Sequence, residues 1–148
     1  MYFGIGIYHT KHEVNVGSLY RSAFIMGASF VFTIGKRYKR QASDTVNTTK
    51  QIPYFDYKSF DEFYANMPID CKLIAVELIK DAKPIYDFVH PKNAIYLLGA
   101  EDHGIPASIV SRCHETIFLP VEHSLNVANM GTIVCYDRNL REAYRGKK

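Results

Sequence analysis

The sequence lacks the marks of a membrane-inserted or exported protein. None of its apolar runs approaches the roughly 20 residues that a membrane-spanning helix needs. Residues 1–5 have neither the basic start nor the small-residue cleavage site of a signal peptide. With 148 residues, 47% hydrophobic and 22% charged, the chain has the composition of one soluble domain with its own core. We expect a cytoplasmic protein with a single domain, 1–148, and a frayed basic tail after about residue 144.

Patterns for disulfides and metal sites are missing too. The three cysteines, an odd number, form no Cys-x-x-Cys pair. Buried free thiols are therefore expected, rather than a disulfide framework or a zinc site. The six histidines show neither His-x-x-x-His nor His-Glu-x-x-His spacing, so we expect no metal site.

Two common nucleotide-binding signatures are also missing. The segment Gly99–Gly104 joins a predicted strand to a predicted helix, but Ile105 and Pro106 stand where a phosphate-binding loop needs Lys and Ser or Thr. The nearest approach to Gly-x-Gly-x-x-Gly is Gly4 and Gly6, which lie inside a predicted strand with no third glycine in place. These two glycines indicate close backbone packing instead. The absences argue against an ATPase and against an NAD-dependent enzyme.

Strand-like and helical patterns alternate along the chain. Aromatic and β-branched runs predict strands at 2–8, 30–34, 52–57, 72–78, 94–98 and 115–119. Apolar periodicity and helix-start residues predict helical segments at 16–27, 59–67, 83–89, 106–113 and from 124 toward 138. Such alternation predicts an α/β fold with a mostly parallel sheet and helices on both faces. Segment 35–51 has no period and is interpreted as a long loop, either functional or disordered.

Positive charge is concentrated in two segments. The net charge is only +3, yet residues 35–51 hold five cations against one acid, and residues 138–148 hold five more against one acid. Two basic patches favour an anionic polymer such as RNA as partner, whereas the alternative is two solvated surface segments. The candidate RNA-binding residues are Lys36, Arg37, Lys39 and Arg40.

Three short stretches carry candidate chemistry. In the first, Asn15 precedes a predicted helix as a possible cap, and Arg21 offers a planar guanidinium to a phosphate, although a plain surface arginine is the alternative. In the second, Gly99 lets a ligand approach the backbone, and Glu101 lies at the carboxyl end of a predicted strand, where ligands bind in parallel sheets. In the third, a strand breaks at a proline and enters a helix whose free N–H groups Ser124 can cap.

Together the three stretches resemble the ordered motifs of one family. The motifs are Asn15-x-Gly17-x-x-x-Arg21-x-Ala23, then Leu98-Gly99-Ala100-Glu101-Asp102-His103-Gly104-Ile105-Pro106, then Leu119-Pro120 with Ser124-Leu125-Asn126-Val127. They are similar to those of the SpoU/TrmH family of S-adenosylmethionine-dependent RNA ribose 2′-O-methyltransferases, which have the knotted SPOUT fold. The resemblance covers about residues 2–136. It implies a C-terminal trefoil knot, bound S-adenosyl-L-methionine, a tRNA or rRNA substrate, and a homodimer with the site near its interface.

The resemblance also implies roles for particular residues. Those in the catalytic pocket are Arg21, Asn15, Glu101, Ser124 and Asn126. Those that bind the cofactor are Val76, Leu98, Gly99, Leu119, Ser124 and Leu125. Arg21 is expected to hold the phosphate beside the reacting ribose rather than to take its proton, because arginine stays protonated. No metal or second cofactor is needed.

The apolar surface of the predicted helices bears on assembly. The apolar faces of the helix Val16–Gly27 and of the helix after Asn126 together offer more apolar surface than one small domain is expected to cover. This surface independently predicts a homodimer.

The chain departs from the family pattern at two points. Only residues 121–123 separate the proline from Ser124, where most members have a longer loop, and residues 128–130 are Ala-Asn-Met in place of Ser-Val-Ala. The short loop bears on the shape of the methionine pocket, so the alternative to an enzyme is a non-catalytic RNA-binding module on the same fold. A base N-methyltransferase on a related knotted fold is less favoured, because the Ser-Leu-Asn motif points to ribose chemistry.

Overall fold

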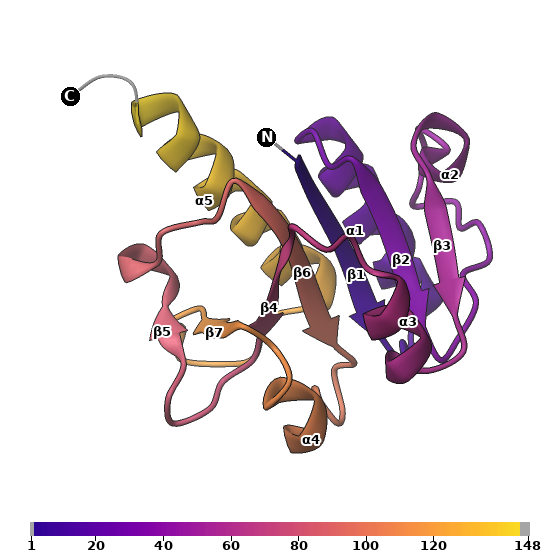
Figure 1. The fold of residues 1–148 in the computed structure, drawn as a ribbon. Coiled ribbons are helices and arrows are strands. Elements are labelled where there is room, and N and C mark those ends of the chain that lie inside the picture. Colours follow the sequence, from indigo (N-terminus) through magenta and orange to yellow (C-terminus); the bar gives the residue numbers. More distant parts are fainter. Residues whose placement is uncertain (1, 146–148) are drawn as a thin grey trace.

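The described residues, 2–145, form one seven-stranded sheet in which every pairing is parallel. The strands of this computed structural model are β1 (Tyr2–Tyr8), β2 (Phe30–Ile34), β3 (Tyr54–Tyr57), β4 (Lys72–Val76), β5 (Lys83–Pro84), β6 (Asn93–Gly99) and β7 (Glu115–Phe118). Their order is β3-β2-β1-β6-β4-β7-β5 (Figure 1). The expected parallel α/β sheet is confirmed, and β5 is a short strand in the segment that was predicted to be a helical turn.

Helices cover both faces of this sheet, as expected. They are α1 (Glu13–Ile25), α2 (Thr48–Gln51), α3 (Phe60–Asn66), α4 (Ala107–Val110) and α5 (Val127–Arg145), with a 3₁₀ turn, η1 (Ile85–Asp87). In Figure 1, α1 and α5 lie behind the sheet, whereas α3 and α4 lie in front of it. Asn139 of α5 donates to the carbonyl of Met26, just after α1, with an Nδ2–O distance of 2.8 Å. The two long helices therefore form one layer.

Each face of the sheet has its own buried cluster. Behind the sheet, Leu19 of α1 and Cys135 of α5 pack against β1 and β6. In front of it, the rings of Phe63 and Phe32 stack with their centroids 4.7 Å apart. A Cβ atom on Gly6 would lie 2.4 Å from the Phe32 carbonyl oxygen, so the glycine admits the neighbouring strand. This is the close packing that the sequence predicted.

Two helices begin at other residues than predicted. α1 begins at Glu13, so Asn15 lies within its first turn and does not cap it. α5 begins at Val127, and its first turn is capped by Asn126, whose Oδ1 accepts from the Ala128 N–H at 2.8 Å. Ser124 lies in the preceding loop, where its side chain is exposed. Serine and asparagine are both good N-caps, so residue type alone did not decide between the two positions.

The basic loop after β2 is ordered by two buried side chains. Asp44 is fully buried, and its carboxylate accepts from the backbone N–H of Thr48 at 2.9 Å and from its hydroxyl at 2.8 Å. Tyr38 is buried against Tyr20, with the ring centroids 5.0 Å apart. A buried carboxylate that keeps its donors fixes the backbone around it. The loop therefore has a defined course and ends in α2, so it is not disordered.

The C-terminal basic segment does not form the predicted patch where the structure describes it. Arg138 is only 1% exposed. Its guanidinium donates to the carbonyl oxygens of Pro91 and Lys92, at 2.7 and 2.6 Å, and lies over the Phe3 ring, 5.0 Å from the centroid. This arginine anchors α5 to the start of β6 and cannot bind a phosphate.

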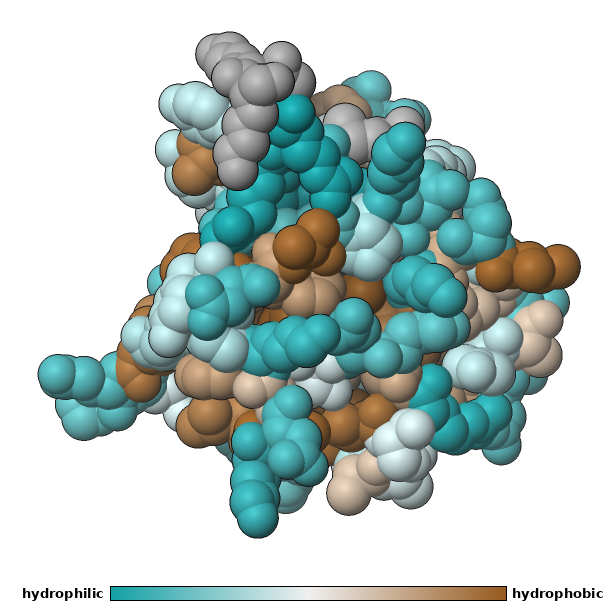
Figure 2. All heavy atoms as spheres, turned by 60° about the vertical axis from the view of Figure 1, so that its left-hand side comes forward, coloured by the Kyte–Doolittle hydropathy of each residue, from teal (hydrophilic) through white to brown (hydrophobic). Residues whose placement is uncertain are grey.

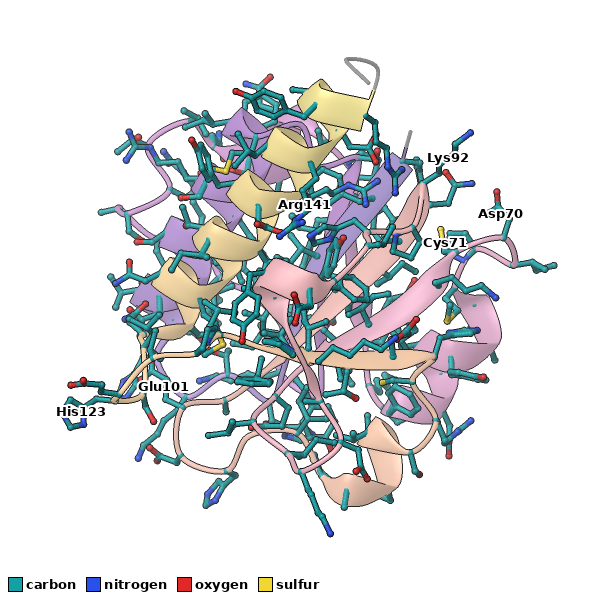
Figure 3. All side chains as sticks on the ribbon, turned by 90° about the vertical axis from the view of Figure 1, so that its left-hand side faces the viewer. Asp70, Cys71, Lys92, Glu101, His123 and Arg141 are labelled. Carbon is teal, nitrogen blue, oxygen red and sulfur yellow. The ribbon has the colours of Figure 1, made fainter. Side chains whose placement is uncertain are left out.

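Two further arginines of α5, Arg141 (labelled in Figure 3) and Arg145, are partly exposed and also bonded within the chain. Arg141 donates to the Asp137 carboxylate at 2.7 Å, and Arg145 donates to the carbonyl of His90 at 2.8 Å. Arg145 is therefore helical and bonded, although it was expected to be frayed. The rest of the expected tail, 146–148, lies outside the described residues.

Several sequence expectations about special features can be compared with residues 2–145. No helix there is long and apolar enough to span a bilayer. The cysteines are free: Cys71 and Cys135 are buried as expected, whereas Cys113 is half-buried. Burial raises the pKa of the Cys135 thiol to about 12. Within the described part of the chain, no cluster of three or more His, Cys, Asp and Glu side chains could hold a metal ion.

Candidate active site

A cavity of about 200 Å³ opens at the carboxyl ends of β4, β6 and β7. These three strands are neighbours in the sheet. The rest of the wall comes from the loop after β7 and from the first turn of α5. In open parallel sheets, ligands bind outside the carboxyl ends of the strands.

The wall of the cavity is mostly apolar, with a few polar groups. Its apolar side chains include Val76, Leu119, Leu125, Val127 and Met130. Its polar side chains are Glu77, Glu101, His123 and Ser124. An apolar wall with a small number of polar groups is typical of a site for a small organic molecule.

The loop after β6 folds back tightly over Gly99. The Gly104 N–H donates to the Ala100 carbonyl at 2.9 Å, and the Glu77 carboxylate accepts from the Ile105 N–H at 2.8 Å. A Cβ atom on Gly99 would lie only 2.4 Å from the Gly104 carbonyl carbon. Gly99 thus makes room for its own loop. This is a more direct reason for glycine than the expected approach of a ligand, although Gly99 also lines the cavity.

A chain of amide and carboxylate groups joins the three motifs at the cavity. The Asn15 Nδ2 donates to Glu101 Oε1 at 2.5 Å, and the Asn126 Nδ2 donates to Asn15 Oδ1 at 2.8 Å. Glu101 itself lines the cavity. Three residues predicted to share a pocket, from positions up to 111 residues apart, are therefore in direct contact.

Further contacts hold the β1–α1 loop against the β6–α4 loop. Lys11 forms an ion pair and hydrogen bond with Asp102, which lowers the pKa of that carboxyl. The His12 Nε2 lies 3.8 Å from a Glu101 oxygen. In Figure 3, Glu101 and His123 lie on the side of the molecule where α5 begins. The hydrogen bond between Asn15 and Glu101 is thus accompanied by an ion pair, Lys11 with Asp102, and by the approach of His12 to Glu101, all between the start of α1 with its preceding loop and the loop after β6.

Arg21 lies apart from this chain of contacts. Its side chain is exposed on α1, and among residues 2–145 it has no hydrogen-bond or ion-pair partner. The helix α1 is continuous from Glu13, so Asn15 and Arg21 lie on the same regular helix. Six residues of α-helix separate two side chains by about 9 Å along the axis and about 120° around it. Asn15 and Arg21 therefore face different directions within one chain.

The basic loop lies against the first turns of α1. The Ser43 hydroxyl donates to the Val14 carbonyl at 2.7 Å, and a Cβ atom on Gly17 would lie 2.4 Å from the Ser43 oxygen. The glycine of the first motif therefore makes room for this loop. All four predicted RNA-binding side chains are exposed. Two have acidic neighbours at 3.5 Å, Lys36 with Glu13 and Arg37 with Asp56, and the other two are Lys39 and Arg40.

Comparison with known sequences identifies the family. No curated protein sequence matches the chain significantly. The model of the SpoU rRNA Methylase family matches residues 3–136. The chain belongs to this family. The match covers all three motifs and the whole cavity.

Solved structures of SpoU and TrmH proteins share the fold of this SpoU chain. AviRb, a SpoU methyltransferase from Streptomyces viridochromogenes, matches with a TM-score of 0.83 at 21% identity, over 96% of this chain and 60% of its own. The A. aeolicus TrmH/SpoU tRNA modifying enzyme matches with a TM-score of 0.85 at 18% identity, over 97% and 77%. A protein described through the 2-OH methylation of C/U34 on tRNA gives 0.82 at 19% identity, over 97% of both chains. This SpoU chain thus spans less than two thirds of AviRb.

The residues expected to bind the cofactor of a SpoU protein divide into two groups. Five line the cavity: Val76, Gly99, Leu119, Ser124 and Leu125. Leu98 does not, because its side chain is fully buried in the core beneath α1 and α5. Sequence reasoning missed Glu77 and Leu78, because the predicted strand was extended through them, whereas β4 ends at Val76. A strand end placed two residues earlier would have identified both as loop residues at the cavity.

Proposed function

We propose that this SpoU chain is an S-adenosylmethionine-dependent RNA methyltransferase that acts on a ribose 2′-hydroxyl of tRNA or rRNA. The observation that carries the proposal is the contact of Glu101, Asn15 and Asn126 at the mouth of the cavity. Membership of the family supports the reaction. One structural neighbour is described through 2-OH methylation of tRNA, and AviRb is known in complex with AdoMet.

The residues of the cavity suit S-adenosylmethionine. Val76, Leu119 and Leu125 offer apolar contacts to an adenine ring, and the Glu101 carboxylate favours a nearby sulfonium cation. Ser124 offers a hydroxyl at the same wall. The bound cofactor supplies a methyl group that is already activated by the sulfonium. The protein's part is then to position a ribose hydroxyl in line with that methyl group.

The chain of amides gives this positioning a physical basis. Asn126 is held at both ends of its amide, by Asn15 and by the Ala128 N–H, so its orientation is fixed before RNA binds. Fixed polar groups lose little free energy in reorganisation during the reaction. The 2′-hydroxyl must lose its proton during or after attack. We assign the acceptor to the neighbouring phosphate or a water, because arginine keeps its proton at neutral pH.

The proposed assembly is a homodimer through the outer sides of α1 and α5. The apolar face on which the sequence prediction rested, including Leu19 and Tyr20, is covered within the chain itself. Other apolar side chains are exposed instead: Val14 and Ile25 on α1, and Ile133, Tyr136 and Leu140 on α5. On the face around β5, apolar groups are interspersed with hydrophilic ones (Figure 2). We place the dimer contact on α1 and α5 because their five exposed apolar side chains lie on two helices that share one layer.

A dimer through this surface would also give Arg21 a role. Arg21 lies four residues before Ile25 and seven after Val14, so the three share one side of α1. Its unpaired guanidinium would then meet the second copy rather than its own cavity. We propose that Arg21 holds an RNA phosphate near the interface, with the cations Lys36, Arg37, Lys39 and Arg40 extending the contact. The trefoil knot expected for the family is part of the same proposal.

The alternative is a non-catalytic RNA-binding module with a defective cofactor pocket. It rests on the short loop 121–123. Val121 and His123 of this loop both line the cavity, so the shortened loop still supplies part of the wall. This observation favours the enzyme.

Calorimetry with S-adenosylmethionine tests the cofactor directly, and mapping of 2′-O-methyl positions in total RNA, with and without the protein, tests the reaction. The proposal expects binding and at least one protein-dependent methylated ribose. RNA binding without cofactor binding would establish the alternative.

A further inference from the structure

His9 follows β1 in a backbone conformation that disfavours a side chain. Its φ is 48°, in the left-handed region, where residues other than glycine lose free energy. The turn is fixed there, because the His9 N–H donates to the Ile34 carbonyl of β2 at 2.8 Å. A glycine would adopt the same turn without that cost. The turn therefore does not explain why this position carries an imidazole side chain.

The His9 ring is packed on two sides and otherwise exposed. A Cβ atom on Gly35 would lie 2.3 Å from the His9 Nε2, so the ring rests against the backbone of this glycine. The Tyr8 ring is its other neighbour, with the centroids 4.4 Å apart. Within residues 2–145, the imidazole has no hydrogen-bond or ion-pair partner. His12, by contrast, faces Glu101. The surroundings of His9 thus suit contact through the ring rather than proton transfer.

His9 lies between the cavity and the basic loop. Tyr8, just before it, pairs with Gly99 of β6 on one side and with Ile34 of β2 on the other. Gly99 lines the cavity, and neighbouring strands are about 4.8 Å apart. On the far side, the exposed cations Lys36 and Arg37 follow the glycine on which the imidazole rests.

We propose that His9 is a stacking platform for an unpaired RNA base next to the nucleotide whose ribose is methylated. Aromatic rings among cations bind single-stranded RNA well, because every base presents a π-face and the cations meet the phosphates. A single RNA strand bound to both the basic loop and the cavity would pass over His9. The inference rests on the proposed function and adds to it the subsite that orients the RNA.

The test compares His9→Gly with His9→Phe in the full chain. Glycine suits the positive φ and removes the ring, whereas phenylalanine keeps a ring and loses both nitrogens. The probe is a short single-stranded oligoribonucleotide that carries 2-aminopurine, whose fluorescence falls on stacking. Wild type and His9→Phe should bind and quench it alike. His9→Gly should bind about tenfold more weakly without quenching, while its melting temperature stays equal or rises.

Equal binding and quenching by His9→Gly and wild type would overturn the stacking role, as would loss of quenching in His9→Phe. Tyr86→Ala removes an exposed aromatic ring elsewhere and should leave both signals unchanged, which controls for non-specific stacking. Affinity for S-adenosylmethionine, by calorimetry, should be the same in all four proteins. If wild type binds no cofactor and methylates no RNA, the proposed function fails, yet the 2-aminopurine comparison still decides the role of His9.

Discussion

Asn126 connects the start of α5 to the start of α1: its Nδ2 donates to Asn15 Oδ1 at 2.8 Å, while its Oδ1 accepts from the Ala128 N–H at 2.8 Å. One side chain therefore caps α5 and holds an amide of α1. Since Asn15 also donates to Glu101, the position of α5 and the position of the cavity mouth are linked through a single amide.

Asn126→Asp separates the two tasks of this residue. Aspartate is as good an N-cap as asparagine, but it cannot donate to Asn15. We expect stability within about 1 kcal/mol of wild type and a methyl-transfer rate lower by about tenfold or more, the scale of one missing positioning hydrogen bond at roughly 1.4 kcal/mol. The matched control, Asn126→Ala, should lose both the rate and the cap. Chemical denaturation and single-turnover transfer measure the two effects. An Asn126→Asp enzyme with full activity would remove the Asn15 contact from the mechanism.

Gly99→Ala should weaken cofactor binding by moving the loop at the cavity. The added Cβ meets the Gly104 carbonyl carbon at 2.4 Å, so we expect a loss of about 1–3 kcal/mol in stability from overpacking together with lower affinity for S-adenosylmethionine. Gly27→Ala is the control, because its φ of +90° is strained for alanine while no atom lies within 4 Å of the new methyl. It should lose stability and keep its affinity. Calorimetry and thermal unfolding distinguish the two variants; equal affinities in both would dissociate the loop from the site.

Lys39→Ala with Arg40→Ala should weaken RNA binding and flatten its dependence on salt. Every phosphate that the protein no longer neutralises removes close to one unit from the slope of log affinity against log salt. Affinity for S-adenosylmethionine should be unchanged. Lys36→Ala with Arg37→Ala should have a smaller effect, because these cations have acidic neighbours at 3.5 Å. Lys92→Ala is the control, because Lys92 lies just before β6, at the amino ends of the strands and away from the basic loop (Figure 3). If the slope of RNA affinity against salt were the same in all three variants and wild type, the basic loop would be a solvated surface segment without a role in RNA binding.

Because His90 is buried, the fold should lose stability as the pH becomes mildly acidic. Its ring is buried, with Nδ1 2.5 Å from the Tyr96 hydroxyl and Nε2 2.9 Å from the Asp137 carboxylate. Burial raises the pKa of Tyr96 to about 12, so its hydroxyl stays a donor and a neutral imidazole satisfies both partners.

Burial, which outweighs the opposing effect of Asp137, lowers the pKa of His90 below its ordinary value of about 6.5. The unfolded chain then binds more protons than the folded one as the pH falls below about 6.5, so stability is lost in that direction. His90→Gln cannot titrate and should lose less stability between pH 7.5 and 5.5. Thermal unfolding across this range measures the difference, since the other histidines are the same in both proteins. Parallel pH profiles would contradict the assignment to His90.

The fold was largely predictable because buried parallel strands are continuous apolar runs. Segments such as Phe30–Ile34 and the strand around Tyr96 could be recognised from residue type and length alone. The short strand β5 was not, because two residues beside a proline carry no period. Its place in the sheet is fixed by pairing with Ile117 and Phe118 of β7, a tertiary contact that a local pattern cannot contain.

The sequence grouped some of the residues that meet at the cavity, but not their geometry and not Glu77 or Leu78. The motifs correctly brought Asn15, Glu101 and Asn126 together. Cap residues were misplaced, because the choice between Ser124 and Asn126 depends on where α5 meets α1. The arginines of α5 were misread as a patch, since their charge is visible in the sequence whereas the carbonyl oxygens that take up Arg138 come from residues 46 and 47 positions away.

The motif and the structure of a single chain place Arg21 differently. The motif puts it beside the reacting ribose, yet its side chain is exposed on the side of α1 that carries Val14 and Ile25. If it holds a phosphate in the transition state, Arg21→Ala should reduce single-turnover methyl transfer by about 100-fold, the scale of removing one oxyanion donor. Arg21→Lys should recover only part of that rate, because it keeps the charge and loses the planar fork. Cofactor affinity should not change.

Mixing two inactive variants then shows which cavity Arg21 serves. One partner is Arg21→Ala, which keeps an intact cavity, and the other is Gly99→Val, which keeps Arg21 and should lose its cofactor. If Arg21 acts across a two-fold interface, each mixed dimer contains one complete site, and random mixing should restore roughly a quarter of wild-type activity. If it acts within its own chain, every site in the mixture carries a lesion and no activity returns. Light scattering at micromolar concentration must show a dimer for the mixture to be informative, and a monomer there would itself refute the proposed assembly. Recovery of activity would place the guanidinium at the partner's ribose, which is the arrangement that its exposed position on α1 predicts.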